Sequence, residues 1–106
     1  MKKCLAEFVG TAILVIVGCG SAVAGGYGAS GAVGLAAISL AFGFIVAGLV
    51  YALGPISGCH INPAITLSVW AAGRMPAREV PGYVVAQMAR ASVGRPSCRS
   101  LYGYKV

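Results

Sequence analysis

A polar segment, Ser57-Gly58-Cys59-His60-Ile61-Asn62-Pro63-Ala64-Ile65-Thr66, interrupts a chain that is otherwise strongly apolar. It offers hydrogen-bond donors and acceptors, but no acid–base pair and no nucleophile beside a base. His60 is a residue type that ligates metals, yet no second ligand stands at a helical offset from it, so we expect a packed or carbonyl-bonded histidine. The segment therefore predicts polar contacts without bond-making chemistry, and neither an enzyme nor a cofactor or metal site is expected.

Asn62 and Pro63 predict where a short helix begins. Asparagine is a favoured N-cap, and proline a favoured first helical residue, because its missing N–H would have no partner there. The helical pattern runs over about residues 63–72 and Gly73 ends it. Such a helix measures about 15 Å, half of the roughly 30 Å bilayer core. A helix that starts at mid-depth with its positive dipole end inside typically lines a permeation path.

The composition is that of an integral membrane protein. Apolar residues make up 58% of the 106 residues and charged residues 9%, against about 25% charge in soluble domains. The net charge is +6, but the basic residues gather at the two ends and in one short loop. We therefore expect membrane lipid, and no nucleic acid, as a partner. The four cysteines show no C-x-x-C pair, and no disulfide framework is expected.

Residues 4–24 form a first apolar run, long enough to span a bilayer. Glu7 lies inside it, and two interpretations stay open: an interior carboxylate with a partner, or a solvated one at the interface. The run also has features of a signal peptide, with Ala22-Val23-Ala24 as a cleavage site, although Glu7 would interrupt its apolar core.

A second apolar run covers residues 33–53, and Gly54-Pro55 is expected to stop it. Small residues at helical spacing should let another helix approach closely; they are Ala41, Gly43, Ala47 and Gly48. Residues 55–73 hold prolines and polar side chains and cannot span a bilayer alone. Irregular backbone at membrane depth is tolerated where it lines a water-filled cavity or is buried in protein, so we expect a re-entrant segment.

A third helix is expected from about residue 80, but only ten residues precede Arg90, against about 20 for a full span. We expect it to be incomplete. Residues 90–106 form a basic tail that differs in kind from residues 1–89, as a truncation or a shifted reading frame would produce. A genuine polar tail after a short interfacial helix is the alternative.

The basic residues also predict the orientation. Lys2 and Lys3 precede the first helix, and Arg74 and Arg78 follow after two spans and the re-entrant segment, so both pairs lie on one side. The positive-inside rule makes that side cytoplasmic. We expect a multi-pass protein of the cell's inner (plasma) membrane with a cytoplasmic N-terminus.

The pattern Ser-Gly-x-His-x-Asn-Pro-Ala-x-Thr over residues 57–66 resembles the aquaporin family, the major intrinsic proteins. Residues 6–11, Ala-Glu-Phe-Val-Gly-Thr, resemble the family's first-helix signature, and Leu40-Ala41-Phe42-Gly43 resembles bacterial water channels. The resemblance covers about residues 1–88. It implies an all-α membrane protein holding the first inverted repeat of the aquaporin fold: two full transmembrane helices, a re-entrant half-helix and an incomplete third helix.

The resemblance implies roles for the polar segment. Asn62 would donate its side-chain amide to water in the pore, while Pro63 and Ala64 would pack against the matching motif of the second repeat. Part of an acceptor ladder along the path would come from three backbone carbonyls, those of Cys59, His60 and Ile61.

Two residues outside the segment also match. Glu7 would brace the re-entrant loop, and Phe42 would stand in the selectivity constriction, where it favours water over glycerol. Without the resemblance, Phe42 would be interpreted as packing or lipid-facing. The chain departs from the family at Cys59, where a smaller residue is usual, and at Arg90, where glycine is usual.

The predicted function is a water channel that passes water passively, with this chain holding only the first half and the second repeat missing. A homotetramer is implied by the family. One alternative is a truncated, membrane-inserted fragment without transport activity. Another is a half-channel that dimerises in antiparallel fashion, which the one-sided basic residues disfavour because it needs both orientations.

Overall fold

The computed structural model describes residues 1–23 and 32–90, with the backbone alone for residues 32 and 33. Its helical elements include α1 (Lys2–Ser21), α2 (Ala32–Ser57), α3 (Pro63–Ala71) and the 3₁₀ turn η2 (Ala77–Glu79). A further α-helix begins at residue 80 and runs to residue 90, where the described range ends; it is called helix 80–90 here. The described ranges contain no strand, so the all-α prediction is confirmed. The predicted basic tail lies outside them.

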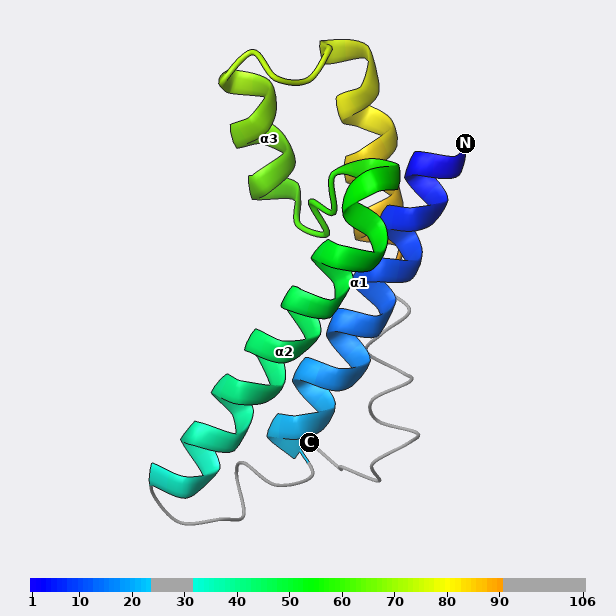
Figure 1. Cartoon of the computed structure of the whole chain (residues 1–106). Coiled ribbons are helices and arrows are strands. Elements are labelled where there is room, and N and C mark those ends of the chain that lie inside the picture. The colour runs from blue at the N-terminus through cyan, green and yellow to red at the C-terminus, as the bar shows by residue number, and fades with distance from the viewer. Residues whose placement is uncertain (24–31, 91–106) are drawn as a thin grey trace.

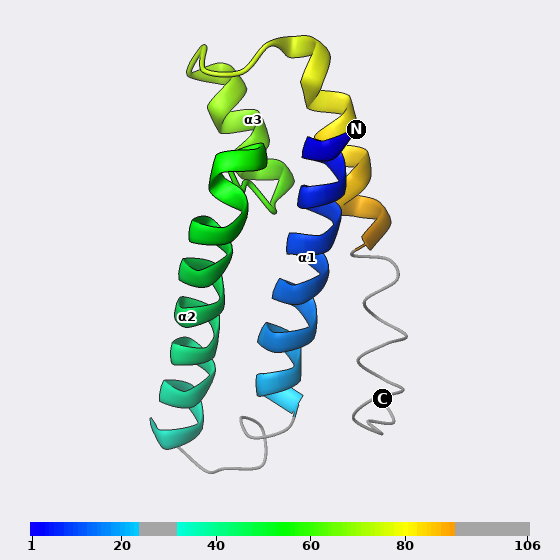
Figure 2. The same ribbon diagram turned by 45° about the vertical axis from the view of Figure 1, so that its right-hand side comes forward.

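The helices α1 and α2 lie side by side and run in opposite directions (Figures 1 and 2). After α2 the chain turns back through residues 58–62 into α3, and helix 80–90 then returns along the other side of α1 (Figure 2). The start of α1 and the start of helix 80–90 therefore lie at the same end of the bundle. The basic residues of the two chain segments, Lys3 and Arg78 among them, meet at that end.

Both long helices have the length and apolarity needed to cross a membrane. Lys2–Ser21 has a mean hydropathy of 1.9 and Gly34–Ser57 a mean hydropathy of 2.2. Much of this apolar surface is exposed, including large side chains of α2 such as Leu35, Phe44 and Val50. Exposed apolar surface on this scale is unfavourable in water, whereas hydrocarbon accepts it.

The predicted end of α2 at residue 53 is wrong, because the helix continues through Pro55 to Ser57. Pro55 lies in the last turn, where its missing N–H removes a single helical hydrogen bond. The helix ends instead at Gly58, whose φ of +86° is a left-handed conformation that glycine adopts easily. The Gly58 N–H donates to the Gly54 carbonyl at 2.9 Å. The extra turn carries Ser57 to the start of the re-entrant loop.

The close approach of α1 and α2 uses glycines of α1. A Cβ at Gly10 would lie 2.7 Å from side-chain atoms of both Leu53 and Ile61, and one at Gly18 would overlap the Phe42 ring. Gly43 and Gly48 of α2, which were expected to admit another helix, have nothing within 4 Å of such a Cβ in the described part of the chain. Gly10 therefore admits both α2 and the re-entrant loop.

A bulkier residue at Gly10 should loosen this contact. We expect Gly10→Val to lower the free energy of unfolding by about 1–3 kcal/mol, the usual cost of overpacking. Denaturation of the purified chain in detergent micelles, followed by circular dichroism, measures the change. Gly43→Val is the matched control, since it adds the same side chain in open space on α2. Equal losses of stability in both variants would contradict the assigned packing.

Candidate functional site

The carboxylate of Glu7 is the centre of the candidate site and is fully buried, at 0% exposure. Oε1 accepts hydrogen bonds from the Ser57 hydroxyl at 2.7 Å and the His60 backbone N–H at 2.9 Å. Oε2 accepts from the Ile61 N–H at 2.5 Å and the Gln87 side-chain amide at 2.8 Å. All four partners are donors, as an ionised carboxylate requires. The interpretation of Glu7 as a solvated interfacial residue is excluded.

These hydrogen bonds hold the re-entrant loop in an unusual backbone conformation. Cys59 and Ile61 have φ values of +51° and +45°, in the left-handed region that costs a residue with a side chain about 1–2 kcal/mol. The Cys59 N–H donates to the Ser57 hydroxyl at 3.1 Å, so Ser57 links this amide to Glu7. Three successive amides of the loop, those of residues 59–61, thus point toward the carboxylate or its partner.

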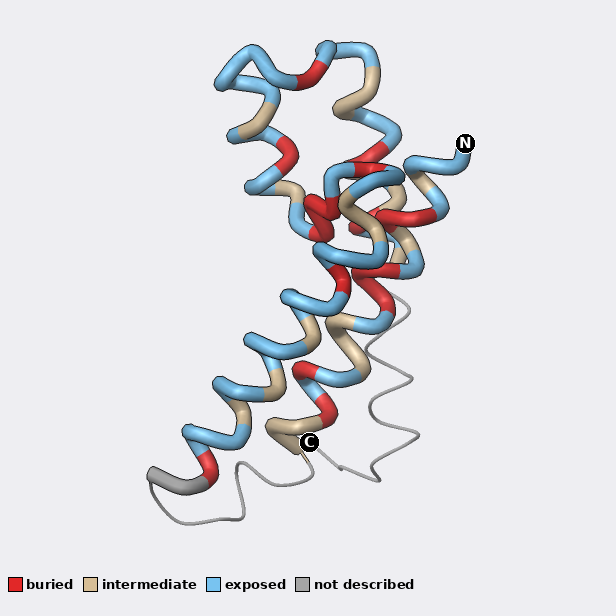
Figure 3. The backbone as a smooth tube through the Cα atoms, viewed as in Figure 1, coloured by how far each residue is buried: buried red, intermediate tan, exposed pale blue. Residues whose placement is uncertain are grey.

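Helix 80–90 contributes two side chains to the same network. Tyr83 donates its hydroxyl to the Ser57 carbonyl at 2.8 Å, and Gln87 donates to Glu7 and, at 3.0 Å, to the Thr66 hydroxyl. Tyr83 is 3% exposed and Gln87 is 1% exposed. They are four residues apart and so share one face of the helix. Figure 3 shows the buried residues gathered where the loop meets α1 and this helix.

His60 is packed inside the network. Its Nδ1 lies 3.2 Å from the Thr66 hydroxyl, and its ring centroid lies 5.2 Å from that of Tyr83. The backbone N–H of His60 donates to Glu7. The two ring contacts hold the loop against α3 and helix 80–90.

Asn62 caps α3 and stays exposed. Its side-chain oxygen accepts from the Ala64 N–H at 2.8 Å, and Pro63 occupies the first helical position, as the sequence predicts. With the oxygen held in this way, the NH₂ group of the amide turns away from the helix end. α3 has nine residues, a length of about 14 Å.

The loop carbonyls face a different environment from the loop amides. Within residues 1–23 and 32–90, no donor is bonded to the carbonyls of Cys59 and His60, while Ile61 receives a long contact of 3.5 Å from the Thr11 hydroxyl. The amides of residues 59–61 donate to Ser57 and Glu7. The carbonyls of Cys59 and His60 are therefore available to partners outside the described residues. Cys59 itself packs with Leu49 and Ile61 in the apolar core.

Phe42 is not brought to the other predicted site residues. It lies 15 residues before Ser57 on α2, about 22 Å along the helix axis. Its ring packs over Gly18 of α1 and is 38% exposed. The contact with Gly18 therefore agrees with the interpretation of Phe42 as a packing residue.

Sequence reasoning missed four members of the network: Ser57, Thr66, Tyr83 and Gln87. Gln87 carried a usable signal, because an amide in an apolar helix needs partners and therefore faces the interior. Tyr83 stands four residues before it, on the same face. Ser57 and Thr66 were inside the recognised motif, but nothing in their spacing shows which groups they bond.

Replacing Glu7 should release the loop. In Glu7→Gln the amide NH₂ would face a backbone N–H, so at least one buried donor loses its acceptor, and we expect the free energy of unfolding to fall by about 3 kcal/mol. Hydrogen exchange at the amides of His60 and Ile61 should speed up in parallel. Glu79→Gln is the matched control at the chain's other acidic residue. It removes a partly exposed ion pair with Lys3, which typically contributes about 0–1 kcal/mol.

Removing the Tyr83 hydroxyl tests whether helix 80–90 helps to hold the loop. We expect Tyr83→Phe to lower the free energy of unfolding by about 1 kcal/mol, because the buried Ser57 carbonyl loses its donor. Tyr51→Phe should change it by less than about 0.5 kcal/mol, since Tyr51 is 88% exposed on α2. Denaturation in detergent micelles compares the two, and indistinguishable variants would argue against the assigned hydrogen bond.

Comparison with known proteins agrees with this geometry. The family model described as "Major intrinsic protein" matches residues 1–104, which is further than the motifs that carry the resemblance. The chain is 46% identical over 109 residues to Aquaporin AqpM of Methanothermobacter marburgensis, and 51% identical over 94 residues to Aquaporin Z of Bradyrhizobium diazoefficiens. Each alignment covers 88% of this chain. Aquaporin Z of Rhodopseudomonas palustris is 50% identical over 88 residues, or 82% of the chain.

These alignments cover 44%, 39% and 36% of the three relatives, so the chain spans about two-fifths of the length of the curated relatives it matches. The predicted resemblance is confirmed, and together with the two apolar helices it identifies a membrane protein. The chain belongs to the major intrinsic protein family.

Proposed function

We propose that this chain forms one half of the wall of a water-conducting pore, in which the Asn62 amide and the loop carbonyls contact the water. The observation that carries the proposal is the division of the re-entrant loop into two sides. Its amides are bonded to Glu7 and Ser57, while Asn62 is exposed and the carbonyls of Cys59 and His60 lack donors in the described residues. A donor beside a row of acceptors suits single-file water.

The half-length of α3 supports the same function. Asn62 lies at the positive end of the helix dipole, about 14 Å from the opposite end of α3. A positive dipole end inside a pore raises the energy of cations and protons there without hindering neutral water. Pro63 and Ala64 would pack against the matching motif of a second repeat, and the relatives named Aquaporin Z favour water as the permeant.

Phe42 has a further place in the proposal. A path that runs along α2 would reach Phe42 about 20 Å from the re-entrant loop, close to the opposite membrane surface. We propose that its ring narrows the path there and disfavours glycerol. In the proposed setting, the chain is a multi-pass protein of the inner membrane with a cytoplasmic N-terminus, and the assembled channel is a homotetramer.

The chain alone should not conduct. We expect vesicles carrying only these 106 residues to show the same osmotic water permeability as empty vesicles, because the proposed path has a wall on one side. Stopped-flow light scattering after an osmotic step measures it. A clear rise with a low activation energy would instead favour a pore assembled from copies of this chain.

A chimera tests the proposed role directly. Residues 1–89 of this chain, joined to the second half of Aquaporin Z of Bradyrhizobium diazoefficiens, should raise water permeability well above that of empty vesicles. Asn62→Asp keeps the cap of α3 but replaces the donor with an acceptor, so we expect about a fivefold fall, from roughly 1 kcal/mol per hydrogen bond. Tyr51→Phe, which removes an exposed hydroxyl from the face of α2 opposite Phe42, should leave it unchanged.

The same chimera distinguishes the alternative. A chimera that is helical and inserted but passes no more water than empty vesicles would contradict the proposal. That result would favour a membrane-inserted fragment without transport activity.

A further inference from the structure

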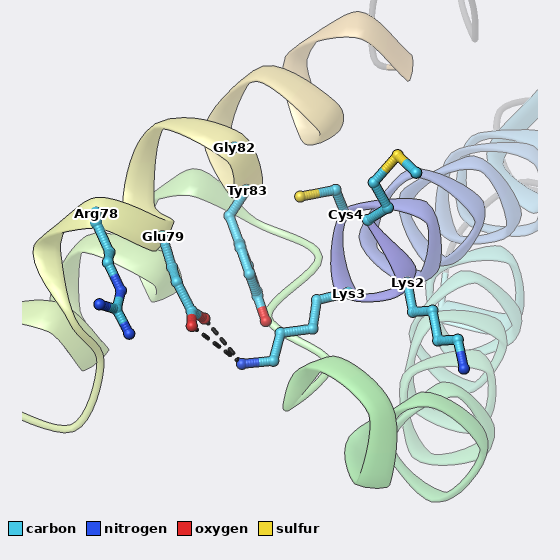
Figure 4. A pocket seen from close by; sticks show the side chains of 8 residues that line it. Lys2, Lys3, Cys4, Arg78, Glu79, Gly82 and Tyr83 are labelled. Carbon is cyan, nitrogen blue, oxygen red and sulfur yellow. Dashed lines mark hydrogen bonds and ion pairs between the residues drawn. The ribbon is translucent and has the colours of Figure 1, made fainter.

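A cavity of about 510 Å³ lies where the start of α1 meets the start of helix 80–90. It is separate from the candidate pore residues and belongs to the end of the bundle that carries the charged side chains. Figure 4 shows the residues that line it, of which six enter the argument: Lys2, Lys3, Cys4, Arg78, Glu79 and Tyr83.

The cavity carries more positive than negative charge. Three cationic side chains and one carboxylate line it, a net side-chain charge of +2. The Lys3 ammonium bonds both oxygens of Glu79, at 2.9 and 3.2 Å, and Figure 4 shows it reaching across to this carboxylate. The ion pair fixes Lys3 and neutralises Glu79. Lys2 and Arg78 are the remaining cations.

No carboxylate side chain of this protein is left to pair with them. The whole sequence contains two acidic residues, and the other one, Glu7, is buried and bonded to the re-entrant loop. The surplus positive charge of the cavity therefore attracts anions from outside the chain. Arginine and lysine together favour phosphate oxygens, arginine through its planar fork and lysine as a mobile point charge.

The rest of the lining is apolar. Cys4 contributes a thiol, and the Tyr83 ring presents its carbon surface because its hydroxyl is bonded to the Ser57 carbonyl. On α1, Leu5 and Val9 share a face with Lys2, three and seven residues after it, and are 64% and 41% exposed. Cationic side chains thus lie at the start of α1, and exposed apolar side chains follow them along the helix. A ligand that suits this arrangement has an anionic head beside the cations and hydrocarbon along α1. A membrane phospholipid has that order, and a free anion does not.

We propose that this cavity binds the headgroup of an anionic phospholipid, which Lys2 and Arg78 attract from the two sides of the Lys3–Glu79 ion pair (Figure 4). Basic residues near a membrane surface attract anionic lipids by about fivefold in affinity per charge. The site would anchor the start of α1 to the start of helix 80–90. It does not depend on whether the chain conducts water.

Spin-labelled lipids test the proposal on the full 106-residue chain. The chain is placed in phosphatidylcholine nanodiscs with a trace of spin-labelled phosphatidylglycerol or phosphatidylcholine, and electron paramagnetic resonance gives the relative association constant of each lipid. We expect a preference for phosphatidylglycerol of at least fivefold. Arg78→Gln and Lys2→Gln should each reduce it about fivefold.

Arg74→Gln is the matched control, because it removes the same charge from the same loop without touching the cavity. We expect it to change the preference less than twofold, and circular dichroism should show equal helicity for all variants. Equal losses in Arg74→Gln and Arg78→Gln would overturn the proposal in favour of diffuse attraction. Displacement of the labelled lipid by millimolar inorganic phosphate would overturn it in favour of a free-anion site.

Discussion

The Glu7 carboxylate lies in an apolar bundle, where an ionised group is tolerated only if donors surround it. The donors come from three separate segments: the end of α2, the re-entrant loop and helix 80–90. Because two of them are backbone amides of the loop, the loop must turn its N–H groups inward. The left-handed conformations of Cys59 and Ile61 follow from this requirement, and the hydrogen bonds offset their cost.

The same requirement decides which groups remain on the outside of the loop. The amides of residues 59–61 are bonded to Glu7 and Ser57, whereas the carbonyls of Cys59 and His60 have no donor in the described residues, and Asn62 follows at the start of α3. We propose that the polar surface of the pore, with its acceptors and one donor, is thus a consequence of satisfying a buried charge. In the proposed pore this surface is the side that meets water, while Leu49, Cys59 and Ile61 keep the back of the loop closed.

The described part of helix 80–90 is bound firmly to the rest of the molecule. Inside the bundle, Gln87 bonds Glu7 of α1 and Thr66 of α3, and Tyr83 bonds the last residue of α2. At the surface, the Lys3–Glu79 ion pair joins η2 to α1. The buried bonds matter more, because the ion pair is partly exposed and screened by solvent. Close contact at Gly82, where a Cβ would lie 3.1 Å from the Cys4 sulfur, brings the two helices together.

The sequence by itself determined the all-α membrane class, the family, the cap at Asn62 and Pro63 and the half-length of α3, because hydropathy, motif and local capping chemistry are all short-range properties. It left the position of Glu7 open and placed the end of α2 four residues early, since a proline in a last turn costs little. Only the tertiary structure decided that Glu7 is buried and that Tyr83 and Gln87 complete its site. Those contacts join residues up to 80 positions apart, and no local pattern encodes which donors will meet a given carboxylate.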